Sequence, residues 1–383
     1  MSLTFDEIVN AARDKAVAPD PSSESWKEGL QILLHDHATV GRLTERGQGI
    51  IKRRYVEALA ARMQVDDYIA NNPHVVQAPI KRPVFILGLP RTGTTMLSSM
   101  LAADPANRSL LRWEAYNAAP PASHGALRTD PRCLAEVAKD EMMQKAAPKV
   151  AAAHFEPGDG PTECVHLLAQ DFRSLMLAVT TTVPTYHDWL NFTDMTSAFE
   201  HRKRVLQILQ STNPGRWVLK MPSDSLFIRQ IFKTFPDARV IWAHRDPYAA
   251  VGSSFGMRGA SRPMFEVDEG RDYMRQYFPL QLALHAARPL EVSRERPDDI
   301  FHLYYDDLIA DPLAQIKKVY GWLGDEWTSA AETGMSAWLR DNPQNKRGKH
   351  SYSLAEWGLS KKDLEPYFSD YLRAHPVATG TEV

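Results

Sequence analysis

The segment from Pro83 to Thr95 constrains the fold of this chain more than any other part of it. The short apolar run PVFILGL (83–89) has the length and composition of a strand that is buried on both faces. The glycine turn GLPRTGTT (88–95) follows, and the helix-forming stretch TMLSSMLAA (95–103) comes next. Strand, glycine turn and helix in this order predict a loop whose backbone N–H groups and helix N-terminus bind a phosphate-like anion.

The strand–helix alternation continues beyond this loop. Further strands are predicted at WVLK (217–220), RVIWAH (239–244) and IFHLYYDDL (300–308), with helical patterns between and after them. Repeated β-α units predict a P-loop-like, three-layer α/β fold with a central parallel sheet. The motifs GLPRTGTT, LKMPSD (219–224) and HRDPYAAVGSS (244–254) all follow strands, at the carboxyl ends where such folds bind ligands.

The rest of the chain is predicted to surround this sheet. Residues 1–80 are interpreted as a helical N-terminal extension packed on the core, because Ile51, Tyr55, Leu59 and Met63 form an amphipathic stripe. Residues 81–383 form the α/β domain, with a substrate-facing insertion at about 118–194. Within that insertion, TECVHLLAQDFRSLMLA (162–178) is predicted to be one helix.

Charge and composition exclude several classes of protein. The chain has 45 Lys+Arg and 47 Asp+Glu, and its net charge of -2 argues against a dedicated nucleic-acid binder but allows a small basic pocket. Two cysteines are too few for a disulfide framework. The N-terminus lacks the pattern of a secretory signal, and no apolar run is long enough for a membrane span. We therefore expect a cytoplasmic enzyme.

The glycine turn departs from the usual P-loop in an informative way. Thr94 stands where nucleotide triphosphatases have the lysine of G-K-[ST], and the cation is instead Arg91, inside the loop. That lysine contacts the β- and γ-phosphates, and the hydroxyl after it binds Mg²⁺. The loop therefore favours a diphosphate-like group bound without metal over ATP with Mg²⁺.

Four ordered motifs then support a resemblance to a known family. GLPRTGTT, LKMP (219–222), AHRDP (243–247) and HSYSL (350–354) resemble those of bacterial sulfotransferases that use 3′-phosphoadenosine 5′-phosphosulfate (PAPS). The resemblance runs from about residue 80 to residue 360. It implies an α/β sulfotransferase that releases 3′,5′-ADP, with no metal requirement.

The resemblance also implies which residues bind PAPS. In the family the first loop holds the 5′-phosphosulfate, which here corresponds to Arg91, Thr92, Gly93, Thr94 and Thr95. An arginine and a serine eight residues later hold the 3′-phosphate, and a late basic segment closes over the cofactor; the matching residues are Arg245, Ser253, Arg347 and Lys349. Many relatives stack adenine on a tryptophan where this chain has Met96, so the adenine contact stays open.

The resemblance implies some catalytic residues and leaves the general base open. Arg91 and Lys220 match family positions that stabilise the transferring group. The general base stays open, because related sequences read L-K-x-P-x-H and carry a histidine where this chain has Asp224. The candidates, with the carboxylates ranked first, are Glu163, Asp224, His166 and the more distant His154.

We therefore expect transfer of a sulfuryl group from PAPS to a hydroxyl or amine of a small, apolar acceptor. The alternatives are a P-loop small-molecule kinase or NTPase, which would need Mg²⁺, and a catalytically inactive nucleotide-binding relative. The 13 histidines are scattered and no metal-binding motif is present, so we predict no metal site and no nucleic-acid partner. The sequence does not indicate the acceptor or the oligomeric state.

Overall fold

A five-stranded parallel sheet forms the centre of the molecule, as predicted. The computed structural model describes residues 3–146, 156–343 and 353–380. The strands are β1 (Val84–Gly88), β2 (Asn107–Arg108), β3 (Arg216–Lys220), β4 (Arg239–His244) and β5 (Ile300–Tyr304). Their order is β2-β3-β1-β4-β5, and every neighbouring pair is parallel. The loop-bearing strand β1 therefore lies at the centre, between β3 and β4.

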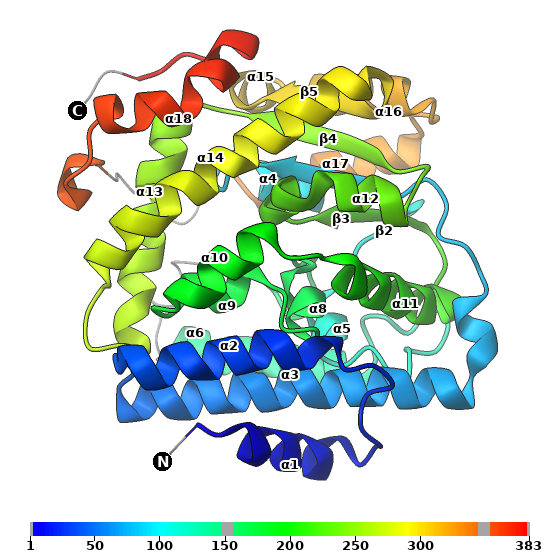
Figure 1. The fold of residues 1–383 in the computed structure, drawn as a ribbon. Coiled ribbons are helices and arrows are strands. Elements are labelled where there is room, and N and C mark those ends of the chain that lie inside the picture. Colours follow the sequence, from blue (N-terminus) through cyan, green and yellow to red (C-terminus); the bar gives the residue numbers. More distant parts are fainter. Residues whose placement is uncertain (1–2, 147–155, 344–352, 381–383) are drawn as a thin grey trace.

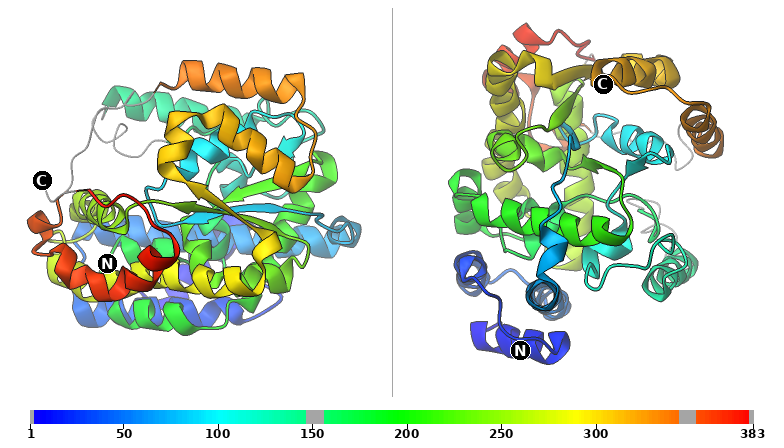
Figure 2. Two further views of the ribbon diagram at one scale, coloured as in Figure 1. Left: turned by 90° about the horizontal axis from the view of Figure 1, so that it is seen from above. Right: turned by 90° about the vertical axis from the view of Figure 1, so that its right-hand side faces the viewer.

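Helices cover both faces of the sheet, which makes the three layers seen edge-on in Figure 2. Val84 and Ile86 of β1 share one core with helices α4 (Thr94–Ala102), α16 (Pro312–Leu323) and α17 (Ser329–Asp341). Phe85 and Leu87 point to the opposite face and share a second core with α11 (Thr196–Thr212), α12 (Ile228–Thr234), α14 (Arg271–Glu295) and α18 (Lys361–Ala374). Alternate residues of β1 thus bury in opposite layers, which explains its uninterrupted apolar sequence.

Three N-terminal helices form the lower edge of the molecule in Figure 1. They are α1 (Phe5–Ala16), α2 (Ser25–Val40) and α3 (Glu45–Asn71). The predicted stripe on α3 is buried, and the Tyr55 ring packs edge-on against Phe172, with 5.7 Å between the ring centroids. These helices share the larger hydrophobic core with the sheet. The division into an extension (1–80) and a domain (81–383) with an insertion stays a prediction.

The remaining elements connect these layers. The helices are α5 (Arg112–Tyr116), α6 (Pro131–Ala146), α8 (Val165–Ala169), α9 (Leu175–Val179), α10 (Pro184–Phe192), α13 (Pro247–Ser261) and α15 (Tyr305–Ala310). Short 3₁₀ turns are η1 (Pro73–Val76), η2 (Pro222–Phe227), η3 (Arg262–Met264), η4 (Pro297–Asp299) and η5 (Ala355–Trp357).

Two predicted elements were wrong in extent. The helix at 162–178 is two short helices, α8 and α9, because Phe172 adopts a left-handed conformation (φ 51°) between them. The buried carboxylate of Asp171 beside it accepts hydrogen bonds from Arg62 and Ser197, so tertiary contacts override helix propensity there. The strand at 300–308 ends at Tyr304, and α15 begins at Tyr305 with Asp306 and Asp307 in its first turn, where acidic residues stabilise a helix.

Within the described ranges, no helix combines the length and apolar character that crossing a bilayer requires.

Candidate active site

The glycine loop joins β1 to α4 at the carboxyl edge of the sheet. Gly93 is the N-cap of α4 and has φ 81°, a conformation that favours glycine. A Cβ atom on Gly93 would lie 3.0 Å from the Tyr305 ring, so a side chain would also crowd α15. The Thr92 hydroxyl donates to the Leu89 carbonyl at 2.7 Å and closes the turn. Thr94 is buried and Thr95 is exposed in the first turn of α4. The loop therefore has a fixed turn directly before a helix N-terminus, which is what an anion site needs.

Two arginines meet at this loop from different elements. Arg91, at the tip, has φ 70°, and its Nε donates to Ser253 Oγ of α13 at 3.2 Å. Arg245, directly after β4, donates from Nη1 to the Arg91 carbonyl at 2.5 Å. The structure therefore brings together Arg91, Arg245 and Ser253, three residues that the sequence assigned to one ligand.

Neither arginine is ion-paired with a carboxylate in the part of the chain that the structure describes. Asp246, the residue next to Arg245 in the sequence, caps α13 by accepting from the Tyr248 N–H at 2.9 Å. The Arg245 guanidinium stacks over the Tyr305 ring at 4.3 Å from its centroid. Two positive charges that form no ion pair within the described ranges, both at a glycine loop, fit an anionic ligand.

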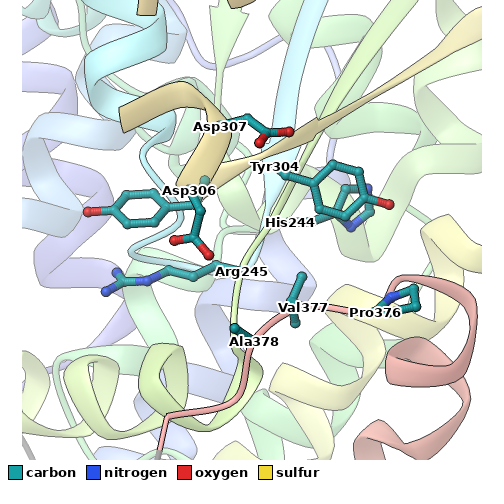
Figure 3. Close-up of a pocket in the computed structure, with 9 residues that line it drawn as sticks. His244, Arg245, Tyr304, Asp306, Asp307, Pro376, Val377 and Ala378 are labelled. Carbon is teal, nitrogen blue, oxygen red and sulfur yellow. The ribbon is translucent and has the colours of Figure 1, made fainter. Parts of the chain in front are cut away.

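A pocket of about 330 Å³ opens beside Arg245. Figure 3 shows His244 and Tyr304 side by side at one end of it and Asp306 near Arg245. The residues that line it are His244, Arg245, Tyr304, Tyr305, Asp306, Asp307, Pro376, Val377 and Ala378. The pocket gives a ligand at the loop room to extend over β4 and β5.

Lys220 and Glu163 form a second charged group at the end of β3. Lys220 Nζ lies 2.8 Å from Glu163 Oε1 and 3.5 Å from Glu156 Oε1. Burial opposes the charge on this lysine, but the two carboxylates outweigh it and raise the pKa of Lys220 above its ordinary value. The lysine side chain is 2% exposed, whereas that of Glu163 is 27% exposed. Of this pair, Glu163 is the residue that an incoming ligand can reach.

Asp224 has a different environment from the one its motif suggested. Both of its carboxylate oxygens accept from Arg202 Nη1, at 2.9 and 2.8 Å, and both side chains are fully buried. Burial raises the pKa of the Asp224 carboxyl, while Arg202 opposes that change. The Arg202 guanidinium also lies 4.1 Å from the centroid of the Phe199 ring. This geometry argues against Asp224 as a base, because no acceptor can reach a carboxylate enclosed in the core.

His166 lies on α8, close to the carboxylates. Its ring packs against Tyr116, with centroids 4.9 Å apart, and its Nδ1 has no hydrogen-bond partner among the described residues. Burial lowers the pKa of His166 to about 4, so the imidazole is neutral at pH 7.

Three predicted residues lie outside the described ranges. Arg347 and Lys349 fall in 344–352, and His154 falls in 147–155. Their assignments stay predictions.

Sequence reasoning missed two supports of the loop. Ser225 Oγ accepts from the Gly88 N–H at 3.2 Å and so connects the 3₁₀ turn after β3 to the loop strand. The Tyr305 ring lies under the Arg245 guanidinium and limits the space at Gly93, although the sequence analysis placed Tyr305 inside a strand. Its position directly after a strand of the parallel sheet was the signal that would have found it.

The glycine loop, Ser253 and the two arginines, which form no ion pair among the described residues, are the features of an α/β protein whose site suits an anionic ligand. A sequence model of the Sulfotransferase family matches residues 83–329, which is more than half of the chain. The chain belongs to this family and is, as predicted, a sulfotransferase by family and fold.

Relatives support this assignment over different shares of the chain. The crystal structure of sulfotransferase STF9 from Mycobacterium avium is 37% identical, with a TM-score of 0.93 over 99% of this chain and 98% of that one. Sulfotransferase STF1 from Mycobacterium tuberculosis H37Rv is 28% identical, with a TM-score of 0.84 over 96% and 99%. The omega-hydroxy-beta-dihydromenaquinone-9 sulfotransferase Stf3 of Mycobacterium bovis is 27% identical over 63% of this chain. That match spans only 62% of the Stf3 sequence.

Proposed function

We propose that this protein transfers a sulfuryl group from PAPS to a hydroxyl or amine of a small, apolar acceptor. The observation that carries this proposal is the meeting of Arg91, Arg245 and Ser253 at a glycine loop, with no carboxylate paired to either arginine in the described ranges. The donor has a phosphosulfate and a 3′-phosphate, and two separate cations suit two separate anionic groups.

The loop would hold the phosphosulfate end of the donor. Backbone N–H groups from Thr92 to Thr95 and the N-terminus of α4 favour negative charge there. Arg91 compensates the charge that develops on the leaving oxygen. Arg245 and Ser253 would hold the 3′-phosphate, and Arg347 and Lys349 would close over it, as the family resemblance implies.

Glu163 is the base that we propose. The acceptor loses its proton to the Glu163 carboxylate as its oxygen or nitrogen forms a bond to sulfur, and the bond from sulfur to the phosphate oxygen breaks to release 3′,5′-ADP. Glu163 is accessible, and Lys220 donates a hydrogen bond to one of its oxygens at 2.8 Å, so its position is held. Asp224 is enclosed with Arg202, and His166 is the remaining alternative.

The acceptor class is supported by a relative. Stf3 is named for an omega-hydroxy-menaquinone, an acceptor that carries a hydroxyl group. We propose a hydroxyl on an apolar molecule as the first acceptor class to test. Both cysteines are free thiols, which suits the reducing cytoplasm that we propose as the site of action.

A donor experiment separates the possible functions. The purified protein is incubated with ³⁵S-labelled PAPS and hydroxylated apolar acceptors, with and without EDTA, and in parallel with ATP and Mg²⁺. We expect labelled product and 3′,5′-ADP, with turnover that requires no added Mg²⁺. Binding of 3′,5′-ADP without transfer to any acceptor would indicate an inactive relative, and response to ATP with Mg²⁺ alone would indicate a kinase or NTPase.

A further inference from the structure

Three histidines from three separate elements meet on one face of the sheet. His244 ends β4, His302 lies in β5, and His375 is the C-cap of α18. One potential ligand atom from each lies within 4.8 Å of the other two. We propose that they form a binding site for a divalent transition metal, with Zn²⁺ as the best fit to an all-imidazole donor set.

The strand register explains why two of these histidines are neighbours. His302 pairs with Trp242, and His244 pairs with Tyr304, so all four side chains project from the same face of β4 and β5. His244 Nε2 lies 2.9 Å from His302 Nδ1. Two imidazoles bound to one Zn²⁺ at about 2.0–2.1 Å place their nitrogens about 3.3 Å apart, so this pair needs little adjustment.

His375 brings the third nitrogen from the helical layer that covers this face of the sheet. Its ring stacks on His244 with centroids 4.1 Å apart, and its Nδ1 lies 3.3 Å from Tyr304 Oη. The backbone of His375 is held by its N–H, which donates to the Tyr371 carbonyl at 2.8 Å. The imidazole can therefore turn toward the other two by side-chain rotation, with the end of α18 in place.

The surroundings supply two further features of a metal site. The Tyr371 hydroxyl lies 3.1 Å from His244 Nδ1, the ring nitrogen left over when Nε2 binds the metal, and such partners orient metal-binding imidazoles. His244 and Tyr304 also line the pocket in Figure 3, which gives an ion access and leaves room for a water molecule as fourth ligand. Asp306 and Asp307 line the same pocket and offset part of the metal charge.

Because the site lies between β4, β5 and the end of α18, the metal would have a structural role. A shared ion would join β4 and β5 to the C-terminal helix α18, which packs along α14 in Figure 1. It would also fix the residue directly before Arg245. This inference does not depend on the donor or the acceptor, so the metal and the sulfuryl-transfer proposals can fail separately.

The test uses the full chain, stripped with EDTA and titrated with ZnSO₄ in a calorimeter, and in parallel with CoCl₂ in a spectrophotometer. We expect one Zn²⁺ per chain, a rise in melting temperature with zinc, and the visible absorption of tetrahedral Co²⁺. His302→Gln and His375→Gln should each weaken zinc binding at least about tenfold. His35→Gln, which removes an exposed histidine on α2, is the matched control and should bind zinc like the wild type.

Two results would overturn the proposal. One is a wild-type chain that shows neither zinc binding at micromolar concentration nor a Co²⁺ spectrum. The other is zinc binding that His302→Gln leaves unchanged, because the metal would then lie elsewhere. His302 is only half-buried, so His302→Gln decides the question even if His375→Gln fails to fold.

Discussion

Arg245 donates from Nη1 to the backbone carbonyl of Arg91 at 2.5 Å, although the two residues lie 154 positions apart in the sequence. The same Arg91 donates from Nε to Ser253, on the helix that Arg245 precedes. The tip of the glycine loop is therefore held by the segment that we assign to the 3′-phosphate. A change in the contacts to the 3′-phosphate should therefore also change how the loop binds the phosphosulfate.

Replacing Arg245 by alanine should weaken binding of 3′,5′-ADP about 10- to 100-fold, since hydrogen bonds to charged groups contribute about 1.5–3 kcal/mol each. Calorimetric titration measures this directly. Arg271→Ala, which removes an exposed arginine at the start of α14, is the control and should bind normally. Equal affinity in Arg245→Ala and the control would remove Arg245 from the site.

Glu163→Gln should lower kcat about 10²- to 10⁴-fold while changing the KM for PAPS little, because the amide cannot accept the acceptor proton. Glu200→Gln, at an exposed position on α11, should keep wild-type turnover. If Glu163→Gln stayed active and the turnover of His166→Gln fell by that factor instead, His166 would be the base.

Asp224→Asn should lower the free energy of unfolding by about 3–5 kcal/mol, because it leaves the charge of Arg202 buried without its partner. Urea unfolding followed by circular dichroism measures the change. At temperatures where the variant is folded, sulfuryl transfer should continue. A variant of normal stability that had lost turnover would contradict the structural role and restore Asp224 as a candidate base.

The pH dependence of stability should include a contribution from His37, which lies 2.8 Å from the Tyr55 hydroxyl in the core. Burial lowers the pKa of His37 from 6.5 to about 4. The unfolded chain therefore binds a proton more readily, so this contribution is complete above pH 6.5 and is lost as the pH falls toward 4. By pH 5 the loss is about 2 kcal/mol.

His37→Gln should reduce the difference in unfolding free energy between pH 7 and pH 5 by that amount. Urea unfolding at the two pH values is the measurement, and His35→Gln on the same helix is the control because its side chain is exposed. An unchanged pH dependence in His37→Gln would mean that His37 takes up its proton in the folded state.

Several features of the fold could be predicted because they depend on neighbours in sequence. The apolar run of β1, the glycine turn and the helix after it are local patterns, and β3 and β4 also lie where their patterns placed them. The prediction of one helix across 162–178 was wrong because tertiary contacts determine the conformation of Phe172 and the buried Asp171. The two-residue strand β2 was missed because so short an edge carries no periodicity.

Some residues of the candidate site could likewise be predicted from local motifs, and others could not. Arg91, Arg245 and Lys220 could be proposed from motifs, since Lys220 ends β3, Arg245 follows β4 and Arg91 lies in the loop after β1, all at the same edge of the sheet. The sequence could not show which carboxylate acts as the base, because Glu163 and Asp224 differ only in their surroundings. Glu163 lies beside Lys220 and is partly exposed, whereas Asp224 is buried in the core with Arg202.

By itself the sequence determined the parallel α/β architecture, the glycine turn after β1 and the family, because strand, turn and helix signals act over a few residues. Only the tertiary structure decided the partners of the charged and titratable side chains. His244, His302 and His375 looked scattered along the chain, yet strand register and the docking of α18 bring them together. Burial and electrostatic pairing depend on contacts between distant segments, and no local pattern encodes them.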